Sequence, residues 1–183
     1  MDFAYDRNRM IEMVNSMAIS KGDFTLASGA KATFYLDCRR LTLNPKWLIE
    51  ISAGFMEILK EDMPEAVGGM AIGADPITAG IIYQAGLEGL TLDGFIVRKE
   101  PKGHGTGRQV EGPVSPGQKV VIIEDVVTSG GSSIKAIEAA RAFGLEVQKV
   151  IAIVDRQAGG KEAFEKAGVQ FQSLLTLDDL DVG

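Results

Sequence analysis

The sequence is poor in the residues that many structural and catalytic sites require. One cysteine, Cys38, and one histidine, His104, occur among its 183 residues. A single cysteine cannot form a disulfide within the chain, which argues against a small disulfide-bonded scaffold and agrees with a reducing cytoplasm. Without other His or Cys partners, His104 cannot belong to a zinc cluster. No apolar stretch reaches the roughly 18 residues of a membrane-spanning helix, so we predict no membrane span.

The chain also carries fewer positive than negative charges. Its 19 Lys and Arg residues against 25 Asp and Glu residues give a formal net charge of -6 at pH 7. This balance argues against nucleic-acid or anionic-membrane partners, so any phosphate binding must be local. The N-terminal MDFAYDRNRM lacks the continuous apolar region of a signal peptide. We therefore expect a cytoplasmic protein, folded as a single domain over residues 1–183.

Short apolar runs rich in β-branched residues alternate with helix-like segments along most of the chain. This alternation is typical of βαβ units, so we predict an α/β fold with a mainly parallel sheet flanked by helices. Asn44 and Pro45 carry the cap and first-turn signals of a helix, and a second helix is predicted from Ser132 to a C-cap at Gly144. The expected strands begin near Ala66, Leu92, Lys119 and Val147.

Two parts of the chain depart from this alternating core, which covers approximately residues 44–156. Residues 1–43 suggest an initial helix and two short strands. Together with residues 157–183 they are expected to form a small hood over the carboxyl ends of the core strands, where ligands bind in open α/β sheets. Residues 98–112 concentrate glycine and charge without apolar content, which predicts a mobile loop.

The stretch VVIIEDVVTSGG, residues 120–131, places acidic and anion-binding features side by side. Phosphate binds readily where a strand runs through a small-residue turn into a helix, because backbone N–H groups converge there. The carboxylates of Glu124 and Asp125 would repel phosphate unless they contacted another part of the same ligand, and a ribose 5-phosphate offers vicinal hydroxyl groups for that purpose. Possible hydroxyl donors in and after the turn are Thr128, Ser129, Ser132 and Ser133.

Other phosphate and catalytic motifs do not fit. The nearest approach to a Walker A loop, residues 112–117, continues with Gln118 and Lys119, and the glycines at 103, 105 and 107 do not complete a dinucleotide fingerprint. No G-x-S-x-G elbow supports a serine hydrolase. An ordinary strand-to-helix turn with a solvated acidic pair stays open as the structural alternative for residues 124–131.

Four segments carry a family resemblance. VVIIEDVVTSGGS at 120–132 resembles the phosphoribosyl-pyrophosphate (PRPP) motif of type I phosphoribosyltransferases. RKEPKGHG at 98–105 resembles the flexible catalytic loop of orotate phosphoribosyltransferases, and FTLASGAKATFYLD at 24–37 and VDRQAGG at 154–160 resemble two further segments of that family. The matches follow the family's order through nearly the whole chain.

This resemblance implies an activity. Ribose 5-phosphate would pass from PRPP to orotate, giving orotidine 5'-phosphate and pyrophosphate, in pyrimidine (UMP) biosynthesis. Mg2+ would be bound with PRPP, and no protein side chain is predicted as a direct metal ligand. The enzyme would be a homodimer in which the catalytic loop of one subunit reaches the partner's site. Loop cations would neutralise the departing pyrophosphate, and the loop glycines would allow closure.

The resemblance also implies roles for particular residues. Lys102, His104 and Asp125 would be catalytic. Arg156 and Thr128 would bind orotate, with Phe34 and Tyr35 packing on the pyrimidine or closing the hood. The pyrophosphate loop would contain Gly73, Ala74 and Asp75. The PRPP-binding set comprises Arg98, Lys99, Lys102, His104, Glu124, Asp125, Val126, Val127, Thr128, Ser129, Gly130, Gly131 and Ser132.

Two positions differ from the family pattern, because many relatives carry lysine where this chain has Ala27 and Pro76. Either backbone amides and the mobile loop replace those lysines, or PRPP binds more weakly. Two alternative functions also stay open: a phosphoribosyltransferase for a purine or another base, and a non-catalytic regulatory protein with the PRPP fold. At the residue level, Arg156 could pair with Asp155 or Glu162 instead of a ligand.

Overall fold

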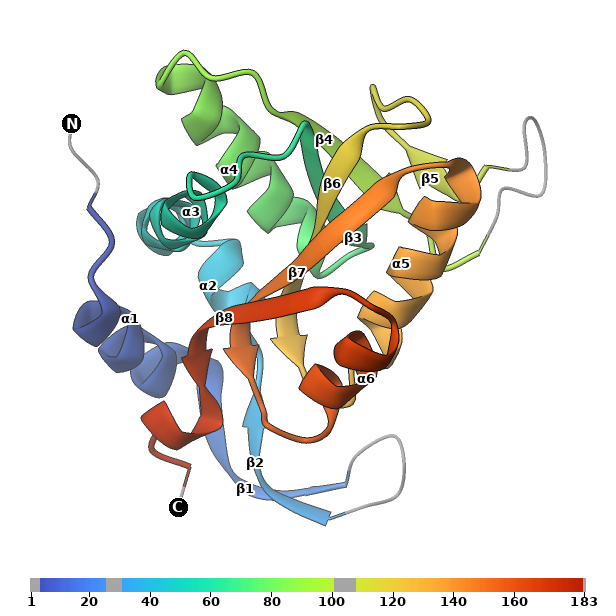
Figure 1. The fold of residues 1–183 in the computed structure, drawn as a ribbon. Helices are drawn as coiled ribbons and strands as arrows, with labels where there is room; N and C mark the ends of the chain where they lie inside the picture. The colour runs from blue at the N-terminus through green and yellow to red at the C-terminus, as the bar shows by residue number, and fades with distance from the viewer. Residues whose placement is uncertain (1–3, 26–30, 101–107, 183) are drawn as a thin grey trace.

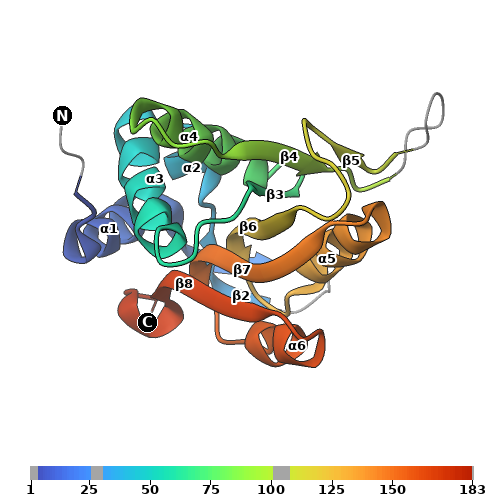
Figure 2. The same cartoon turned by 45° about the horizontal axis from the view of Figure 1, so that its top comes forward.

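A computed structural model describes residues 4–25, 31–100 and 108–182 and shows a central sheet with helices on both faces (Figures 1 and 2). The strand order is β5-β4-β3-β6-β7-β8, and every neighbouring pair is parallel except β4 and β5. The predicted α/β fold with a mainly parallel sheet is confirmed. The six strands are β3 (Ala66–Met70), β4 (Asp93–Val97), β5 (Val110–Glu111), β6 (Lys119–Val127), β7 (Glu146–Asp155) and β8 (Gln170–Thr176).

The sheet is buried on both faces, which explains its continuous apolar runs. In β6, Val121 and Ile123 belong to one core cluster and Val120 and Ile122 to the other, as the alternation of side chains along a strand requires. The first cluster lies under α3 (Pro45–Leu59) and α4 (Ala74–Leu87), and the second lies under α5 (Gly131–Phe143) and α6 (Gly160–Lys166).

The predicted helix ends are confirmed by their caps. Asn44 caps α3 with its side chain accepting the N–H of Lys46, and Pro45 occupies the first turn, where its missing N–H costs nothing. Helix α5 ends at Gly144 in the left-handed conformation, with φ of 102°.

The N-terminal segment forms a small layer at one edge of the sheet. It consists of α1 (Arg7–Met13), a π-helical turn η1 (Val14–Ala18), the antiparallel hairpin β1 (Ile19–Thr25) and β2 (Lys31–Leu36), and the short helix α2 (Arg39–Thr42). In Figure 1 the hairpin lies below the ends of β6 and β7, on the side where those arrows point. The structure differs from the expected C-terminal part of the hood. Residues 170–176 form β8, an edge strand of the central sheet, because they continue its parallel ladder beside β7.

The region predicted as a mobile loop is partly ordered by strand pairing. Val110 and Glu111 form β5 against β4, so residues 98–112 are not loop throughout. Residues 101–107, with Lys102 and His104, lie outside the described residues, as does Ala27. In the described part of the chain, no helix combines the length and apolar character needed to cross a lipid bilayer.

Close packing of β3 against β4 gives a stability prediction. A Cβ on Gly68 would lie 2.1 Å from the carbonyl oxygen of Phe95, whereas a Cβ on Gly86 in α4 would meet nothing within 4 Å. We expect Gly68→Ala to lower the free energy of unfolding by about 2 kcal/mol or more, as overpacking does. Gly86→Ala should raise it by about 0.5–1 kcal/mol. Urea unfolding of both variants tests this, and equal midpoints would contradict the packing argument.

Candidate functional site

The acidic pair and the phosphate-binding turn lie together at the carboxyl end of β6. A cavity of about 220 Å3 is lined by Glu124 and by residues 126–133. Thr128, Ser129 and Ser132 are exposed, and their side chains make no hydrogen bond to a described residue. Their hydroxyl groups are therefore available to a ligand in this cavity.

The turn presents backbone N–H groups because of how α5 begins. Gly130 has φ of 78°, a left-handed conformation that favours glycine, and no side chain caps the helix. A Cβ on Gly130 would also lie 3.0 Å from the ring of Phe164. The first N–H groups of a helix have no partner within it and carry partial positive charge, so this turn can hold an anion without a cationic side chain.

Glu124 is buried, with 6% of its surface exposed. The Oγ of Ser133 donates a hydrogen bond to its Oε2 at 2.9 Å, and the backbone N–H of Asp125 donates to its Oε1 at 3.3 Å. Burial, followed by the negative charge of Asp125, raises the pKa of Glu124 to about 8. Ser133 was expected to face a phosphate group. It is instead buried and supports Glu124, because the first turn of α5 directs it back toward β6.

Asp125 faces the loop that follows β3. A Cβ on Gly73 would lie 3.1 Å from Oδ1 of Asp125, so the predicted pyrophosphate loop and the acidic pair are neighbours. The loop is short, because α4 already begins at Ala74, and Pro76 therefore lies in a helical first turn. One side-chain oxygen of Asp75 is buried without a hydrogen bond to a described residue, and burial raises the pKa of this carboxyl.

Arg156 lies directly after β7 and beside the turn. Val127 pairs with Asp155 in the sheet, and the N–H of Arg156 donates to the carbonyl of Val127 at 2.8 Å. The guanidinium carbon lies 5.1 Å from the centroid of the Phe34 ring, so two residues predicted to bind the base lie together. Tyr35 follows Phe34 in a strand and therefore points to the opposite face, where its ring contacts Phe24.

Arg156 does not form the ion pairs considered as its structural alternative. In the described ranges, its guanidinium makes no salt bridge with Asp155, Glu162 or any other carboxylate. Asp155 accepts the backbone N–H of Gln157 instead. The charge of Arg156 is therefore available to an anionic ligand.

The base of the predicted catalytic loop is closed by two hydrogen bonds. The N–H of Arg98 donates to the carbonyl of Gln109 at 2.9 Å, and Nε2 of Gln109 donates to the carbonyl of Arg98 at 2.8 Å. Arg98 and Lys99 are exposed at this base. Because Lys102 and His104 lie outside the described residues, their positions relative to Asp125 stay predictions.

The supporting residues were not predicted from the sequence. The side chains of Gln157 and Asp178 form a hydrogen bond although the two residues are 21 positions apart in the sequence. No local sequence pattern predicts such a pair. Asp155 was considered from the sequence only as a possible ion-pair partner of Arg156, and its hydrogen bond to Gln157 was not predicted. Within the described segments, no three His, Cys, Asp or Glu side chains come together as a metal-binding group.

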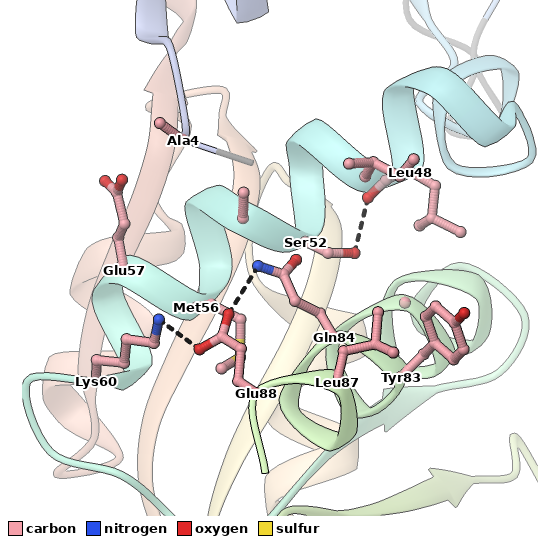
Figure 3. Close-up of a pocket in the computed structure, with 13 residues that line it drawn as sticks. Ala4, Leu48, Ser52, Met56, Glu57, Lys60, Tyr83, Gln84, Leu87 and Glu88 are labelled. Carbon is pink, nitrogen blue, oxygen red and sulfur yellow. Dashed lines mark hydrogen bonds and ion pairs between the residues drawn. The ribbon is translucent and has the colours of Figure 1, made fainter. Parts of the chain in front are cut away.

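A larger cavity lies away from these residues. It measures about 900 Å3 and opens between α3 and α4 (Figure 3), where Ser52, Met56, Tyr83 and Leu87 line it. Ser52 donates only to the carbonyl of Leu48, and the charged residues at one end, Lys60 and Glu88, pair with each other at 2.6 Å. Its lining is mostly apolar, with no cluster of catalytic groups.

Comparison with known proteins gives a consistent result. The Phosphoribosyl transferase domain family matches residues 45–172. An orotate phosphoribosyltransferase of Rhodopirellula baltica is 58% identical over 176 residues, which cover 93% of this chain and 91% of that protein. A crystal structure of Mycobacterium tuberculosis orotate phosphoribosyltransferase with Fe(III) dicitrate is 35% identical, with a TM-score of 0.83 and coverage of 94% and 97%. A crystal structure of the M. tuberculosis enzyme in complex with PRPP is 32% identical to this chain, with a TM-score of 0.80 and the same coverage of both chains.

The raised pKa of Glu124 predicts a pH-dependent stability. Between the ordinary value of 4.5 and about 8, the folded state keeps a proton that the unfolded state has lost, so stability falls as pH rises through this window. The glutamine in Glu124→Gln cannot ionise, so the unfolding free energy of this variant does not fall with pH for this reason. Relative to wild type, the variant should therefore gain on the order of 1 kcal/mol of unfolding free energy per pH unit.

Chemical unfolding of ligand-free protein at pH 5, 6.5 and 8 measures this difference. Glu138→Gln, at an exposed position of α5, is the matched control and should track wild type. A constant difference between Glu124→Gln and wild type at all three pH values would show that Glu124 ionises normally.

Proposed function

This chain belongs to the phosphoribosyltransferase family and is an orotate phosphoribosyltransferase, and we propose that the strand end of β6, the loop after β3 and Arg156 form its substrate sites. The enzyme transfers ribose 5-phosphate from PRPP to orotate, a step of pyrimidine biosynthesis that yields orotidine 5'-phosphate and pyrophosphate. The observation that carries the assignment of sites is the position of a carboxylate pair and an uncapped helix N-terminus at one end of one strand.

The ribose 5-phosphate half of PRPP fits this strand end. Its 5'-phosphate would accept hydrogen bonds from the N–H groups of the turn and from the hydroxyl groups of Thr128, Ser129 and Ser132. Glu124 and Asp125 would accept hydrogen bonds from the ribose hydroxyls, with Asp125 nearer the anomeric carbon. Val126, Val127, Gly130 and Gly131 line the same cavity. Holding the sugar at both ends fixes the anomeric carbon for attack.

The leaving pyrophosphate would lie toward the loop of Gly73 and Ala74, which the contact between Gly73 and Asp125 brings to the reacting carbon. Asp75 follows in the first turn of α4, with one of its side-chain oxygens buried. As the bond to pyrophosphate breaks, positive charge develops on the ribose and negative charge on the leaving group. Arg98, Lys99 and Lys102 would neutralise the leaving group, and His104 would donate a hydrogen bond to it.

Orotate would bind between Arg156 and Thr128. A planar guanidinium can hold a carboxylate through two parallel hydrogen bonds, and Arg156 has no competing carboxylate among the described side chains. Phe34 lies against the same guanidinium and limits its movement. Tyr35 lies on the outer face of the hairpin and would contact the base only if the hood closed over it.

Mg2+ forms part of the proposal as an ion carried by PRPP. Phosphate-bound magnesium keeps several oxygen ligands from substrate and water and needs few from protein. The protein ligands available to the metal fit this description. Glu124 and Asp125 are the carboxylates at the strand end, and no group of three or more potential metal ligands occurs among the described residues. When bound, the ion supplies charge neutralisation for the pyrophosphate. A cytoplasmic location also belongs to the proposal, supported by the free, buried thiol of Cys38.

A homodimer completes the proposal, and α4 offers a surface for it. Tyr83 and Leu87 lie one turn apart on α4 and are 69% and 67% exposed, and Leu90, just beyond the end of the helix, is 37% exposed. Ile72, in the loop before α4 and next to Gly73, is also exposed, at 73%. A helix with apolar residues on its outer side as well as its inner side usually has a second partner. We call these exposed apolar residues the α4 stripe: Ile49 of α3, Ile72, Tyr83, Leu87 and Leu90.

The α4 stripe suits a second copy of the chain. Its members are uncharged, and a twofold interface brings the same patch against itself, so like charges would repel there. It also begins next to the loop of Gly73, so a partner covering it would lie beside the active site. Figure 3 shows Tyr83 and Leu87 on α4 among the residues that line the cavity between α3 and α4.

Lys102→Ala tests the catalytic loop. Turnover with orotate, PRPP and Mg2+ should fall by about two to three orders of magnitude, as loss of transition-state charge stabilisation does, with an unchanged melting temperature. Lys166→Ala, which removes an exposed lysine of α6, is the control. Orotate consumption is followed by absorbance, and full activity of Lys102→Ala would contradict its role.

The same variant tests whether the loop is shared between subunits. Lys102→Ala and Asp125→Asn should each be inactive alone. After subunit exchange, mixed dimers contain one site with both residues intact, so activity should recover to about a quarter of wild type. No recovery in mixtures that demonstrably contain mixed dimers would assign each loop to its own subunit's site.

Tyr83→Lys tests the α4 stripe. A charge in an apolar twofold interface should shift the protein to monomers and reduce activity with it. Ala142→Lys, an exposed position on α5, is the control and should stay dimeric. Sedimentation equilibrium gives the dissociation constant for each variant. A Tyr83→Lys protein that dimerises as tightly as the control would place the interface elsewhere.

A further inference from the structure

Arg156 needs more than Phe34 to hold its direction. The residue is long and partly exposed, and no carboxylate in the described segments pairs with its guanidinium. Free rotation would cost binding energy each time the side chain was fixed on a ligand. Its backbone, however, is fixed at 2.8 Å to the carbonyl of Val127. The path of the chain after Arg156 therefore decides how this side chain leaves the sheet.

Gln157 reverses the chain immediately after Arg156. Its φ of 53° lies in the left-handed region, and it is the one non-glycine residue with positive φ among those the structure describes. This conformation costs a side-chain-bearing residue about 1–2 kcal/mol and persists only where the surroundings impose it. Strain of this kind, one residue from a ligand-binding arginine, points to a functional constraint.

Two carboxylates hold Gln157 in this conformation. Its backbone N–H donates to Oδ1 of Asp155 at 2.8 Å, and Asp155 is 8% exposed. Its side-chain Nε2 donates to Oδ2 of Asp178 at 2.9 Å. Since a carboxylate only accepts, the amide nitrogen must be the group that faces Asp178. Gln157 is thus fixed through its backbone and through its side chain.

The second of these carboxylates belongs to a turn that is itself anchored. Asp178 lies in the 3-10 turn η2 (Leu177–Asp179), which follows β8. Asp179 accepts the N–H and the hydroxyl of Thr176, and it pairs with Arg7 of α1 at 2.7 Å. The C-terminal turn therefore gives Gln157 a fixed partner.

We propose that Gln157, clamped between Asp155 and Asp178, is a positioning residue that directs Arg156 at the carboxylate of the base. The inference rests on the proposed role of Arg156 and extends it to the C-terminal turn. Affinity for an anionic base would then depend on a residue that does not touch it. PRPP binding would not depend on the clamp, because the side chains of Glu124 and Asp125 are held by separate contacts.

Steady-state kinetics of Gln157→Ala and Asp178→Ala test the clamp. Each should raise the KM for orotate about fivefold, the range expected for one lost hydrogen bond, and leave the KM for PRPP unchanged. Asp178→Asn keeps an acceptor oxygen and should retain the wild-type value. Gln172→Ala, at an exposed position of β8, is the control. A rise in both KM values, or no rise in either, would overturn the proposal.

A double-mutant cycle separates positioning from general support of the fold. Arg156→Ala should raise the KM for orotate by about two orders of magnitude, and adding Gln157→Ala to it should have no further effect. An equal effect of Gln157→Ala in both backgrounds would show that it acts independently of Arg156. If Arg156→Ala left the KM for orotate unchanged, the assigned role of Arg156 would fail first, which distinguishes that failure from failure of the clamp alone.

Discussion

The proposed phosphate-binding turn depends on positive charge that comes from peptide groups rather than from side chains. Glu124 and Asp125 lie at the end of the strand whose following turn is proposed to hold a phosphate group. A lysine or arginine fixed in that turn would pair with the carboxylates and occupy the oxygens that the ribose hydroxyls need. Helix N–H groups avoid this competition, because they are directional, cannot extend toward the acids and remain fixed by the helix. Gly130 makes the arrangement possible by taking the left-handed conformation that opens α5.

Sheet topology brings the other parts to the same place. β3, β6 and β7 are adjacent and parallel, so the residues after each of these strands meet at one edge. Gly73, Asp125 and Arg156 are distant in sequence, yet each lies within a few residues of such a strand end. The hairpin of β1 and β2 then covers this edge and delivers Phe34 to Arg156. One scaffold thus brings together the residues proposed for the leaving group, the sugar and the base.

Local patterns allowed the fold and the centre of the site to be predicted. Asn44, Pro45 and Gly144 act within one turn of the chain, so their signals identify helix ends without tertiary information. The β6 strand and its turn are equally local. Ser133 could not be assigned in the same way, because its direction depends on how α5 packs against β6. Likewise, the edge position of β8 and the contact between Gln157 and Asp178 are long-range results of assembly. The sequence shows which residues are chemically suitable, and packing decides which of them reach the ligand.

The remaining constraint is the distribution of side-chain cations. Within the described segments, no ion pair reaches Glu124 or Asp125, and Arg39, whose pKa Asp125 helps to raise, is held by both oxygens of Asp37. Among the described residues, the acidic pair is therefore held by Ser133 and backbone N–H groups and not by a side-chain cation. Pyrophosphate nevertheless needs cations once the bond to ribose breaks. In the proposed mechanism these cations come from Lys99 and Lys102, which belong to the predicted loop whose base is closed by Arg98 and Gln109. Under this proposal, carboxylates on the sheet and cations on the loop serve the two halves of the same substrate.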